Sequence, residues 1–447
     1  MKERDTYKNF AISRDPSKKN ALVLAGGGAK GCYHVGVLQY LAEAGMTFQG
    51  VTGTSIGAMV GAFYVQDDIH KVTDFVMGMT PDAIAEGMPA VPATVKEMIS
   101  ESKNIMTFML NNMYGRLDVT PLRKSVDDIF DFDSFQNSDI AYGCMTYNDT
   151  RKEPRGFLKK DFTRENASEI IMASAACYPA FPKVELDGEL YMDGMYADNV
   201  PIKLMEEVFP DWDQMVVVDI GDPNEHAPKD LTDRMFCIQP LLHPGNSADF
   251  TSEHAIRLYN QGYLEAAKYF GTNPGYIYTF TRDDADLIDV VENYLQQQME
   301  QHKVVLPFNT SVDQSSLQYL LGYQPKTLNN VYSRHYRYGK LVEALGLMAK
   351  VEPVKMRDYT SFLRETCQKL NEMSLSNTDE VDYKMIEMLD NLKKEELTVR
   401  YHKMLVSGGG VYPAAVEAVK ESTPNAYVLA YIWYFIEELI RNLPDQG

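Results

Sequence analysis

A serine flanked by glycines stands in a setting that suggests nucleophilic chemistry. Residues 53–57 read Gly-Thr-Ser-Ile-Gly, which is the G-x-S-x-G pattern. The pattern follows a short apolar segment and precedes an apolar helix that we expect to start near Ile56. Gly53 and Gly57 let the chain turn sharply, so that the Ser55 hydroxyl projects at a helix N-terminus. Ser55 is therefore a candidate nucleophile; the alternative is a serine that caps the helix of an ordinary strand–helix turn.

A second glycine-rich stretch, residues 26–31, reads Gly-Gly-Gly-Ala-Lys-Gly and follows five apolar residues. Gly26, Gly28 and Gly31 satisfy the G-x-G-x-x-G spacing of a dinucleotide site. Such a site also needs an acidic residue about twenty positions later, where this chain has Val-Thr-Gly-Thr-Ser at 51–55. The Walker pattern fails too, because Gly31 is not followed by Lys and Ser or Thr. We therefore expect no nucleotide cofactor.

The same loop can stabilise a different anion. Backbone N–H groups that glycines expose at the start of a helix stabilise the oxyanion of a tetrahedral intermediate as readily as a phosphate. We expect Gly27 and Gly28 to be the donors and Lys30 to add positive charge close to them. The alternative is a tight turn that lets the following helix pack closely.

A serine nucleophile needs a base, and histidine is the usual one. The chain has eight histidines, but only His34 lies close to a candidate motif. An α/β-hydrolase places its serine after several strands, whereas Ser55 has about two strands before it. A carboxylate that acts directly on the serine is the other solution, and Asp193 in "YMDGMYADNVP" suits it because the following glycine leaves room. Asp187 and Asp198 are rival carboxylates, and we rank Asp193 above them.

Together these motifs resemble the patatin-like phospholipases, whose pattern is a G-G-G-x-[KR]-G loop, a G-x-S-x-G elbow and a D-G-[GA] motif. The resemblance runs from residue 21 to about 280 and includes the flanking residues Ser174, Pro182, Asn199 and Pro201. It implies a three-layer α/β/α sandwich and a serine–aspartate dyad without histidine. Ser55 is then the nucleophile, Asp193 the base, and the loop 26–31 the oxyanion hole. One residue departs from the pattern, because Met195 stands where Gly or Ala is usual, and its bulk could shift the Asp193 loop.

The function that this resemblance implies is that of a serine lipid acyl hydrolase. It would cleave carboxylic ester bonds of lipids through an acyl-enzyme at Ser55, without a metal or another cofactor. Two alternatives stay open: a non-catalytic lipid-binding or regulatory protein on the same fold, motivated by Met195, and an acyltransferase. The expected partner is a lipid or ester substrate, and the sequence names no protein partner.

Apolar periodicity and turn residues predict the elements that position these residues. Two successive strand–turn–helix units, beginning at residues 21–25 and near Val51, predict a mainly parallel sheet. The dipeptide Asp187-Gly188 predicts the turn of a hairpin. Further strands are expected at 141–147 and 215–220, and further helices at 167–176 and 251–271.

Beyond residue 281 the signals for strands are sparse. Helical patterns at about 328–350, 354–374, 379–405 and 411–442 predict a helical accessory domain. We therefore divide the chain into an N-terminal arm (1–20), an α/β domain (21–280) and a mainly helical domain (281–447).

Bulk properties limit the partners and the compartment. The chain has 447 residues and a formal charge of −20, which disfavours nucleic acid as a partner. Five scattered cysteines without a C-x-x-C pair favour a reducing compartment. The N-terminus has no apolar signal region, and the longest apolar run, residues 426–436, is too short to span a bilayer. We expect a soluble, cytoplasmic protein, with non-standard secretion left open.

Two segments allow a role in lipid contact. The methionine-rich stretch 77–113 is interpreted as core, with a pliable cap over an acyl chain as the alternative. The aromatic stretch 427–440 is interpreted as a buried helix, with transient contact to a membrane surface as the alternative.

Overall fold

The chain forms two compact units in a computed structural model, residues 1–266 and 267–447. The structure describes residues 17–66, 69–89, 116–221, 228, 230–304, 320, 336–376, 394–412 and 423–442. Most of the proposed N-terminal arm and of the methionine-rich stretch 77–113 lies outside these residues. The observed division falls within a long helix, and the limits 1–20, 21–280 and 281–447 stay predictions.

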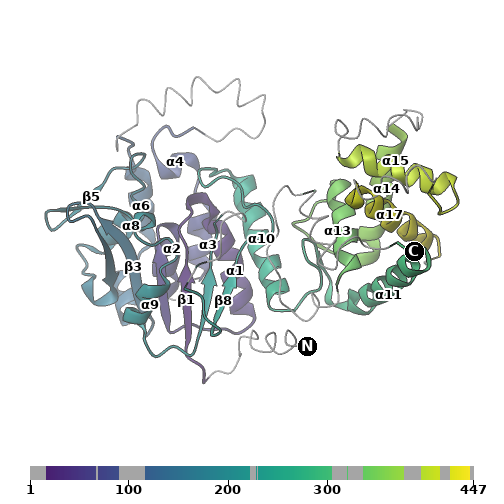
Figure 1. The fold of residues 1–447 in the computed structure, drawn as a ribbon. Helices are drawn as coiled ribbons and strands as arrows, with labels where there is room; N and C mark the ends of the chain where they lie inside the picture. The colour runs from purple at the N-terminus through teal and green to yellow at the C-terminus, as the bar shows by residue number, and fades with distance from the viewer. Residues whose placement is uncertain are drawn as a thin grey trace. The chain divides into compact units, whose positions relative to one another are not determined.

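The first unit is built on one mixed sheet of eight strands, within the described residues (Figure 1). The strand order is β5-β6-β3-β2-β1-β7-β8, and β4 pairs with β3. Five neighbouring strands, β3, β2, β1, β7 and β8, run parallel to one another. The strands β4, β5 and β6 form the antiparallel part of the sheet. The strands are β1 (Asn20–Leu24), β2 (Gly50–Thr54), β3 (Ala141–Asn148), β4 (Glu153–Leu158), β5 (Val184–Leu186), β6 (Glu189–Asp193), β7 (Gln214–Val218) and β8 (Met235–Ile238).

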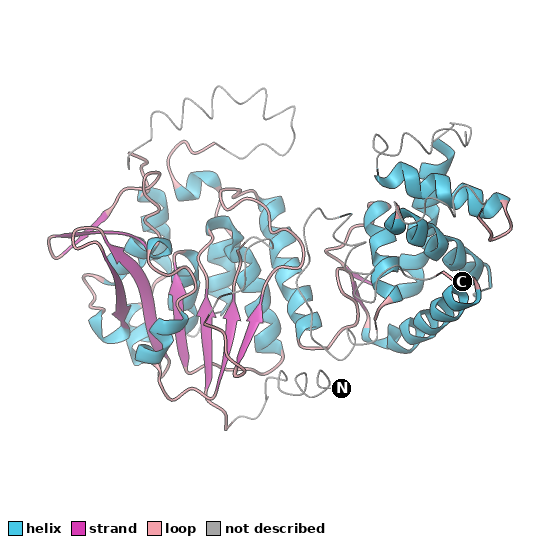
Figure 2. Cartoon of the chain, in the orientation of Figure 1, coloured by secondary structure: helices cyan, strands magenta, loops and turns pink. Residues whose placement is uncertain are grey.

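Helices cover both faces of this sheet (Figure 2), which confirms the three-layer α/β/α arrangement. The helices include α1 (Gly31–Glu43), α2 (Ile56–Val65), α3 (Ile69–Met77), α4 (Pro81–Ile84), α6 (Thr120–Ile129), α7 (Phe132–Asn137), α8 (Ala167–Ser174), α9 (Ile202–Val208) and α10 (Ser252–Tyr269). Short 3-10 turns lie at Gly28–Lys30, Lys159–Asp161 and Gly194–Tyr196.

Neighbouring residues of strand β2 identify the two layers. Gly50 lies against Phe209, which follows α9, whereas Val51 lies against Gly61 in α2. Because successive residues of a strand point to opposite faces, α9 and α2 must cover opposite sides of the sheet. Both faces of the central strands are therefore buried, as their continuous apolar sequences require.

The hairpin that ends in Asp193 has the predicted turn. Asp187 and Gly188 connect β5 to β6 with φ angles of 52° and 76°. Two positive φ angles in succession are the requirement of a type I′ turn, which matches the twist of the two strands. The hairpin places the C-terminal end of β6 beside β3, where Asp193 pairs with Thr146.

The second unit is mainly helical, as predicted. Its helices are α11 (Ala285–Gln301), α13 (Tyr338–Met348), α14 (Tyr359–Ser376), α15 (Lys394–Ser407) and α17 (Pro424–Asn442). A short parallel pair, β9 (Thr279–Phe280) and β10 (Met356–Arg357), accompanies them. Much of the aromatic stretch 427–440 is buried in α17, including Tyr427, Tyr431, Trp433 and Phe435, which agrees with the core interpretation. No helix in the described part of the chain has the length and apolarity needed to cross a membrane.

We expect Gly57→Ala to destabilise the first unit severely. A Cβ atom at Gly57, in the first turn of α2, would overlap the backbone oxygens of Leu24 and Ala25 at the end of β1. Backbone atoms cannot move aside, so the helix would have to shift away from the sheet. Thermal unfolding should show a large fall in the melting temperature or no folded protein.

Gly45→Ala is the matched control. A Cβ atom there has open space and meets only the strain of a positive φ of 74°, so it should cost only about 1–2 kcal/mol. Equal falls in the melting temperature of the two variants would contradict close packing at Gly57.

Candidate functional site

Ser55 lies at the sharp turn between strand β2 and helix α2. Its backbone is held at φ 56° and ψ −126°, an unfavourable conformation for a residue with a side chain. Its N–H donates to the Ser174 hydroxyl oxygen at 2.9 Å, and its carbonyl accepts the Ala58 N–H at 2.9 Å. Strained residues of this kind persist only where the surroundings hold them, and they cluster at functional sites.

Asp193 ends strand β6 with its side chain in the interior of the protein. It is 1% exposed, and its Oδ1 accepts the Met195 N–H at 2.8 Å. The Ser55 side chain lies close enough to this carboxyl group to lower its pKa. Two residues far apart in the sequence thus meet at one edge of the sheet, where the hydroxyl faces a carboxylate that water scarcely reaches.

Burial raises the pKa of Asp193 from 3.8 to about 6, because the charged form loses its hydration. The hydrogen bond from the Met195 N–H and the interaction with the Ser55 side chain lower the pKa and offset part of this effect. The carboxylate is thus mostly ionised at neutral pH, yet a stronger base than an exposed aspartate.

The rival carboxylates take other positions. Asp187 is exposed at the tip of the β5–β6 hairpin. Asp198 uses its carboxylate to accept the Val200 N–H at 3.1 Å, and its carbonyl accepts the Thr54 hydroxyl at 2.8 Å. Asp193 is therefore the carboxylate that the structure brings to Ser55.

The glycine loop passes beside the nucleophile. A Cβ atom on Gly26 would lie 3.2 Å from Ser55 Cβ and closer still to the Asn199 side chain, so only glycine fits there without a shift. The Gly26 N–H donates to the Asn199 carbonyl at 3.1 Å. In the part of the chain that the structure describes, no hydrogen bond occupies the N–H of Gly27 or of Gly28. These two groups are available to an anion.

The structure also brings in residues to which the sequence assigned no role. Ser174, at the end of α8, is fully buried and donates its hydroxyl to the Met145 carbonyl on β3 at 2.7 Å. It therefore connects the Ser55 N–H to the sheet. Asn199 holds Gly26, and the Ser247 carbonyl accepts the Ala29 N–H at 2.8 Å. Ser174 and Asn199 stand in segments that resemble a family, but their contacts depend on pairings that local patterns do not encode.

His34, the histidine nearest to a motif, is buried in α1. Burial lowers its pKa to about 3, so the ring is neutral at physiological pH. Within the described residues no hydrogen bond joins a histidine to Ser55 or Asp193. The described residues contain no cluster of three or more His, Cys, Asp or Glu side chains that could hold a metal ion.

Met195 contacts the aspartate through its backbone. Its N–H binds the Asp193 carboxylate, while its side chain is 50% exposed and lies with Sδ 3.9 Å from Cys177 Sγ. A larger side chain at this position is thus accommodated at the surface. Met195 thus reaches the carboxylate with its backbone and not with its side chain. The shift of the Asp193 loop that its bulk suggests stays a prediction.

Comparisons with known proteins match the first unit. The sequence model of a family described as patatin-like phospholipase matches residues 22–205. Patatin-like phospholipase domain-containing protein 7 of Mus musculus is 28% identical over 205 residues, which cover 46% of this chain and 14% of that protein. Lysophospholipase nte1 of Aspergillus oryzae is 26% identical over 228 residues, which cover 50% of this chain and 13% of that protein.

The chain spans only about one seventh of the length of these curated relatives. Among solved structures, VipD from Legionella pneumophila aligns with 97% of this chain and 93% of its own chain, at 14% identity and a TM-score of 0.34.

We expect Asp193→Asn to stabilise the fold above pH 6. The raised pKa means that the folded state binds a proton more tightly than the unfolded state, so ionisation between pH 3.8 and about 6 destabilises the wild type. Asparagine carries no charge, and its oxygen can still accept the Met195 N–H. Chemical unfolding should give a gain of up to about 3 kcal/mol at pH 7–8 that disappears below pH 4. A loss of stability at all pH values would contradict the buried charge as the dominant effect.

Proposed function

We propose that this chain is a serine lipid acyl hydrolase with Ser55 as nucleophile and Asp193 as base, because residues 22–205 match the sequence model of the patatin-like phospholipase family. The observation that supports the proposal most is that the Ser55 side chain lies beside the buried Asp193 carboxylate, close enough to lower its pKa. The two unoccupied N–H groups of Gly27 and Gly28 support it further, because a carbonyl that reacts with serine needs such donors.

The reaction begins with attack of Ser55 Oγ on the ester carbonyl carbon. Asp193 accepts the hydroxyl proton as the C–O bond forms, and the carbonyl oxygen becomes an oxyanion that accepts hydrogen bonds from Gly27 and Gly28. Collapse of this intermediate breaks the ester bond, and the leaving alcohol takes the proton from Asp193. An acyl-enzyme remains at Ser55.

Water then releases the acyl group. Asp193 accepts a proton from the water as the water oxygen attacks the acyl-enzyme carbonyl, and the same loop receives the second oxyanion. Breakage of the bond to Ser55 Oγ yields a fatty acid, and the proton on Asp193 returns to the serine. The cycle needs no histidine, because the carboxylate both accepts and donates the proton.

The raised pKa of Asp193 is one part of the catalytic effect. A serine hydroxyl is a much weaker acid than a carboxylic acid, so an ordinary aspartate is a poor base for it. A pKa of about 6 in place of 3.8 makes the proton transfer more favourable by about 3 kcal/mol. The remaining mismatch makes the oxyanion donors essential, since loss of one such donor typically costs about 10²–10³-fold in rate.

A carboxylic ester of a lipid is the substrate class that we propose. The names of the relatives, a lysophospholipase and patatin-like phospholipase domain proteins, support it. Transfer of the acyl group to an alcohol or a lysolipid in place of water uses the same acyl-enzyme, so products must be analysed with and without added acceptor. Free fatty acid in both cases supports hydrolysis, whereas a new ester would favour the acyltransferase.

A fluorophosphonate probe tests the nucleophile and the base together. We expect the probe to label Ser55 in the folded wild type and to fail with Ser55→Ala. Asp193→Asn should slow labelling at least about 10²-fold because the general base is lost. The labelling rate of the wild type should fall at least about tenfold for each pH unit below 6, where Asp193 becomes protonated.

Asp187→Asn is the matched control for the base, because that aspartate is exposed on the hairpin that carries Asp193. Its labelling rate should equal that of the wild type. Unlabelled Ser55 in folded wild-type protein would contradict the hydrolase, and near-normal labelling of Asp193→Asn would assign the base to another residue.

Ser174→Ala tests how the nucleophile is held. The substitution removes the acceptor for the Ser55 N–H, which leaves a polar backbone group unpaired next to a strained residue. We expect kcat to fall about tenfold with KM nearly unchanged, because the substrate contacts stay in place. Steady-state kinetics measures this split, and Ser168→Ala in the same helix is the control. An unchanged kcat would show that Ser55 keeps its conformation without Ser174.

A further inference from the structure

The glycine loop is also held by a segment outside the matched residues 22–205. The Ser247 carbonyl oxygen accepts the Ala29 N–H at 2.8 Å. The same oxygen lies so close to Gly28, which has a φ of 57°, that a Cβ atom there would overlap it. The loop 243–251 therefore lies directly against the loop that we propose to bind the oxyanion.

Two anchors bracket the proposed donors. On one side the Gly26 N–H donates to the Asn199 carbonyl, and on the other side the Ala29 N–H donates to the Ser247 carbonyl. Gly27 and Gly28 lie between these anchors, so the anchors determine where their N–H groups point. A shift of Ser247 would turn the donors without any change in the nucleophile or the base.

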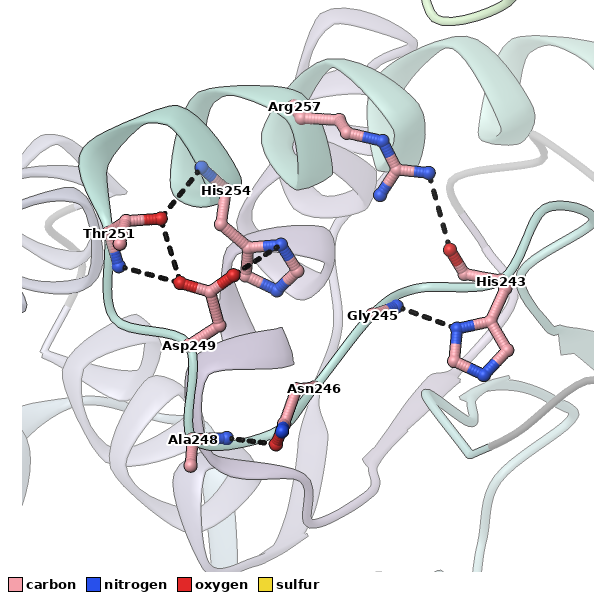
Figure 3. Close-up of polar contacts among 8 residues, drawn as sticks. All are labelled: His243, Gly245, Asn246, Ala248, Asp249, Thr251, His254 and Arg257. Atoms are coloured by element: carbon pink, nitrogen blue, oxygen red, sulfur yellow. Dashed lines mark hydrogen bonds and ion pairs between the residues drawn. The ribbon is translucent and has the colours of Figure 1, made fainter. Parts of the chain in front are cut away.

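Hydrogen bonds within the segment give the loop 243–251 its shape (Figure 3). They run from the Gly245 N–H to His243 Nδ1 at 3.0 Å, from the Ala248 N–H to Asn246 Oδ1 at 2.9 Å, and from the Thr251 N–H to Asp249 Oδ1 at 3.2 Å. Arg257 in helix α10 donates to the His243 carbonyl at 3.2 Å. The loop thus consists of successive local turns and is joined to α10.

The side chain of His254 fills the inside of this loop (Figure 3). It projects from the first turn of α10 and is 8% exposed. Its ring contacts Gly245 so closely that a Cβ atom there would overlap Cε1, and its Nδ1 lies 3.7 Å from Asp249 Oδ2. Among the residues that the structure describes, its buried Nε2 has no hydrogen-bond partner. The ring therefore separates the two ends of the loop and packs beneath its backbone.

Helix α10, which carries His254, packs closely against helix α1. A Cβ atom on Gly36 of α1 would overlap the Tyr259 carbonyl of α10, and one on Gly262 of α10 would overlap the Tyr33 carbonyl of α1. The two helices therefore pack backbone to backbone. Because α1 begins directly after the glycine loop, this packing joins the helix that carries His254 to the helix that follows the loop.

We propose that His254 is a positioning residue for oxyanion binding: its ring supports the loop 243–251, whose Ser247 carbonyl fixes the glycine loop. This inference rests on the proposed function. His254 does not touch the reacting atoms. It acts through the Ser247 carbonyl and the Ala29 N–H.

Charged groups face His254 from three elements: Asp249 in the loop, Arg257 in α10 and Lys30 beside the glycine loop. Burial lowers the pKa of His254 most, Arg257 and Lys30 lower it further, and Asp249 raises it. The folded loop therefore favours the neutral ring. The stability of the folded loop falls as the pH drops below 6.5, the usual pKa of histidine. Acid should weaken the oxyanion loop in addition to protonating Asp193.

The experiment compares His254→Ala and His254→Gln with the wild type in the full chain. We expect His254→Ala to lower kcat and the rate of fluorophosphonate labelling about ten- to hundredfold with KM little changed, because the donors lose their alignment. His254→Gln, which keeps a polar side chain, should recover part of the rate. In both variants a plot of log kcat against pH should have a slope of 1 at low pH. In the wild type the slope of this plot should exceed 1. His70→Ala, an exposed histidine on α3, is the control for all three readouts.

Amide hydrogen exchange gives a readout that does not depend on activity. The peptide that contains residues 26–31 should exchange faster in His254→Ala than in the wild type, while peptides from β3 stay protected. If the wild type neither hydrolyses esters nor labels, the proposed function fails, and exchange alone decides whether His254 positions the loop.

Three results would overturn the inference. They are a kcat within twofold of the wild type in folded His254→Ala, an unchanged slope at low pH in His254→Gln, and unchanged exchange of residues 26–31. If His254→Ala does not fold at the assay temperature, the slope and the exchange of His254→Gln decide the question.

Discussion

The contact between the Ser55 hydroxyl and the Asp193 carboxylate depends on the exclusion of water from the end of strand β6. An exposed carboxylate would be well hydrated and a weak base, whereas at 1% exposure its pKa rises to about 6. Burial of a charge is costly, so the surroundings must be stable enough to tolerate it. The closely packed sheet and the two layers of helices supply that stability, and the rest of the site is arranged around this one carboxylate.

Close approach of backbones is the second constraint, and it explains the glycines. Gly57 lets the first turn of α2 touch the end of β1, and Gly194 lets the chain after Asp193 pass the Met145 carbonyl. Each glycine thus brings a backbone nearer than a side chain would allow. These glycines act in packing, so the G-x-S-x-G motif serves the fold as well as the proposed chemistry.

Much of the fold and the central pair of the site could be predicted from the sequence, because both have local signals. The turn around Ser55 has glycines on each side, and the hairpin before Asp193 has its Asp-Gly turn. Ser174, Asn199 and Ser247 reach the site through pairings over long sequence distances, for which the chain carries no local pattern. Helix α11 was also not predicted, since the sequence after residue 281 indicated helices only from about 328.

The attachment of the glycine loop to later strands limits how the chain can be divided. A fragment that stopped at residue 205 would contain the glycine loop, Ser55 and Asp193. It would lack β7, whose Val218 carbonyl binds the Ala25 N–H, and also the carbonyl that binds the Ala29 N–H. One edge of β1 would then have no paired strand, and the glycine loop would lose a hydrogen bond on each side. The smallest unit able to fold around this site therefore extends well past the last motif residue, to helix α10.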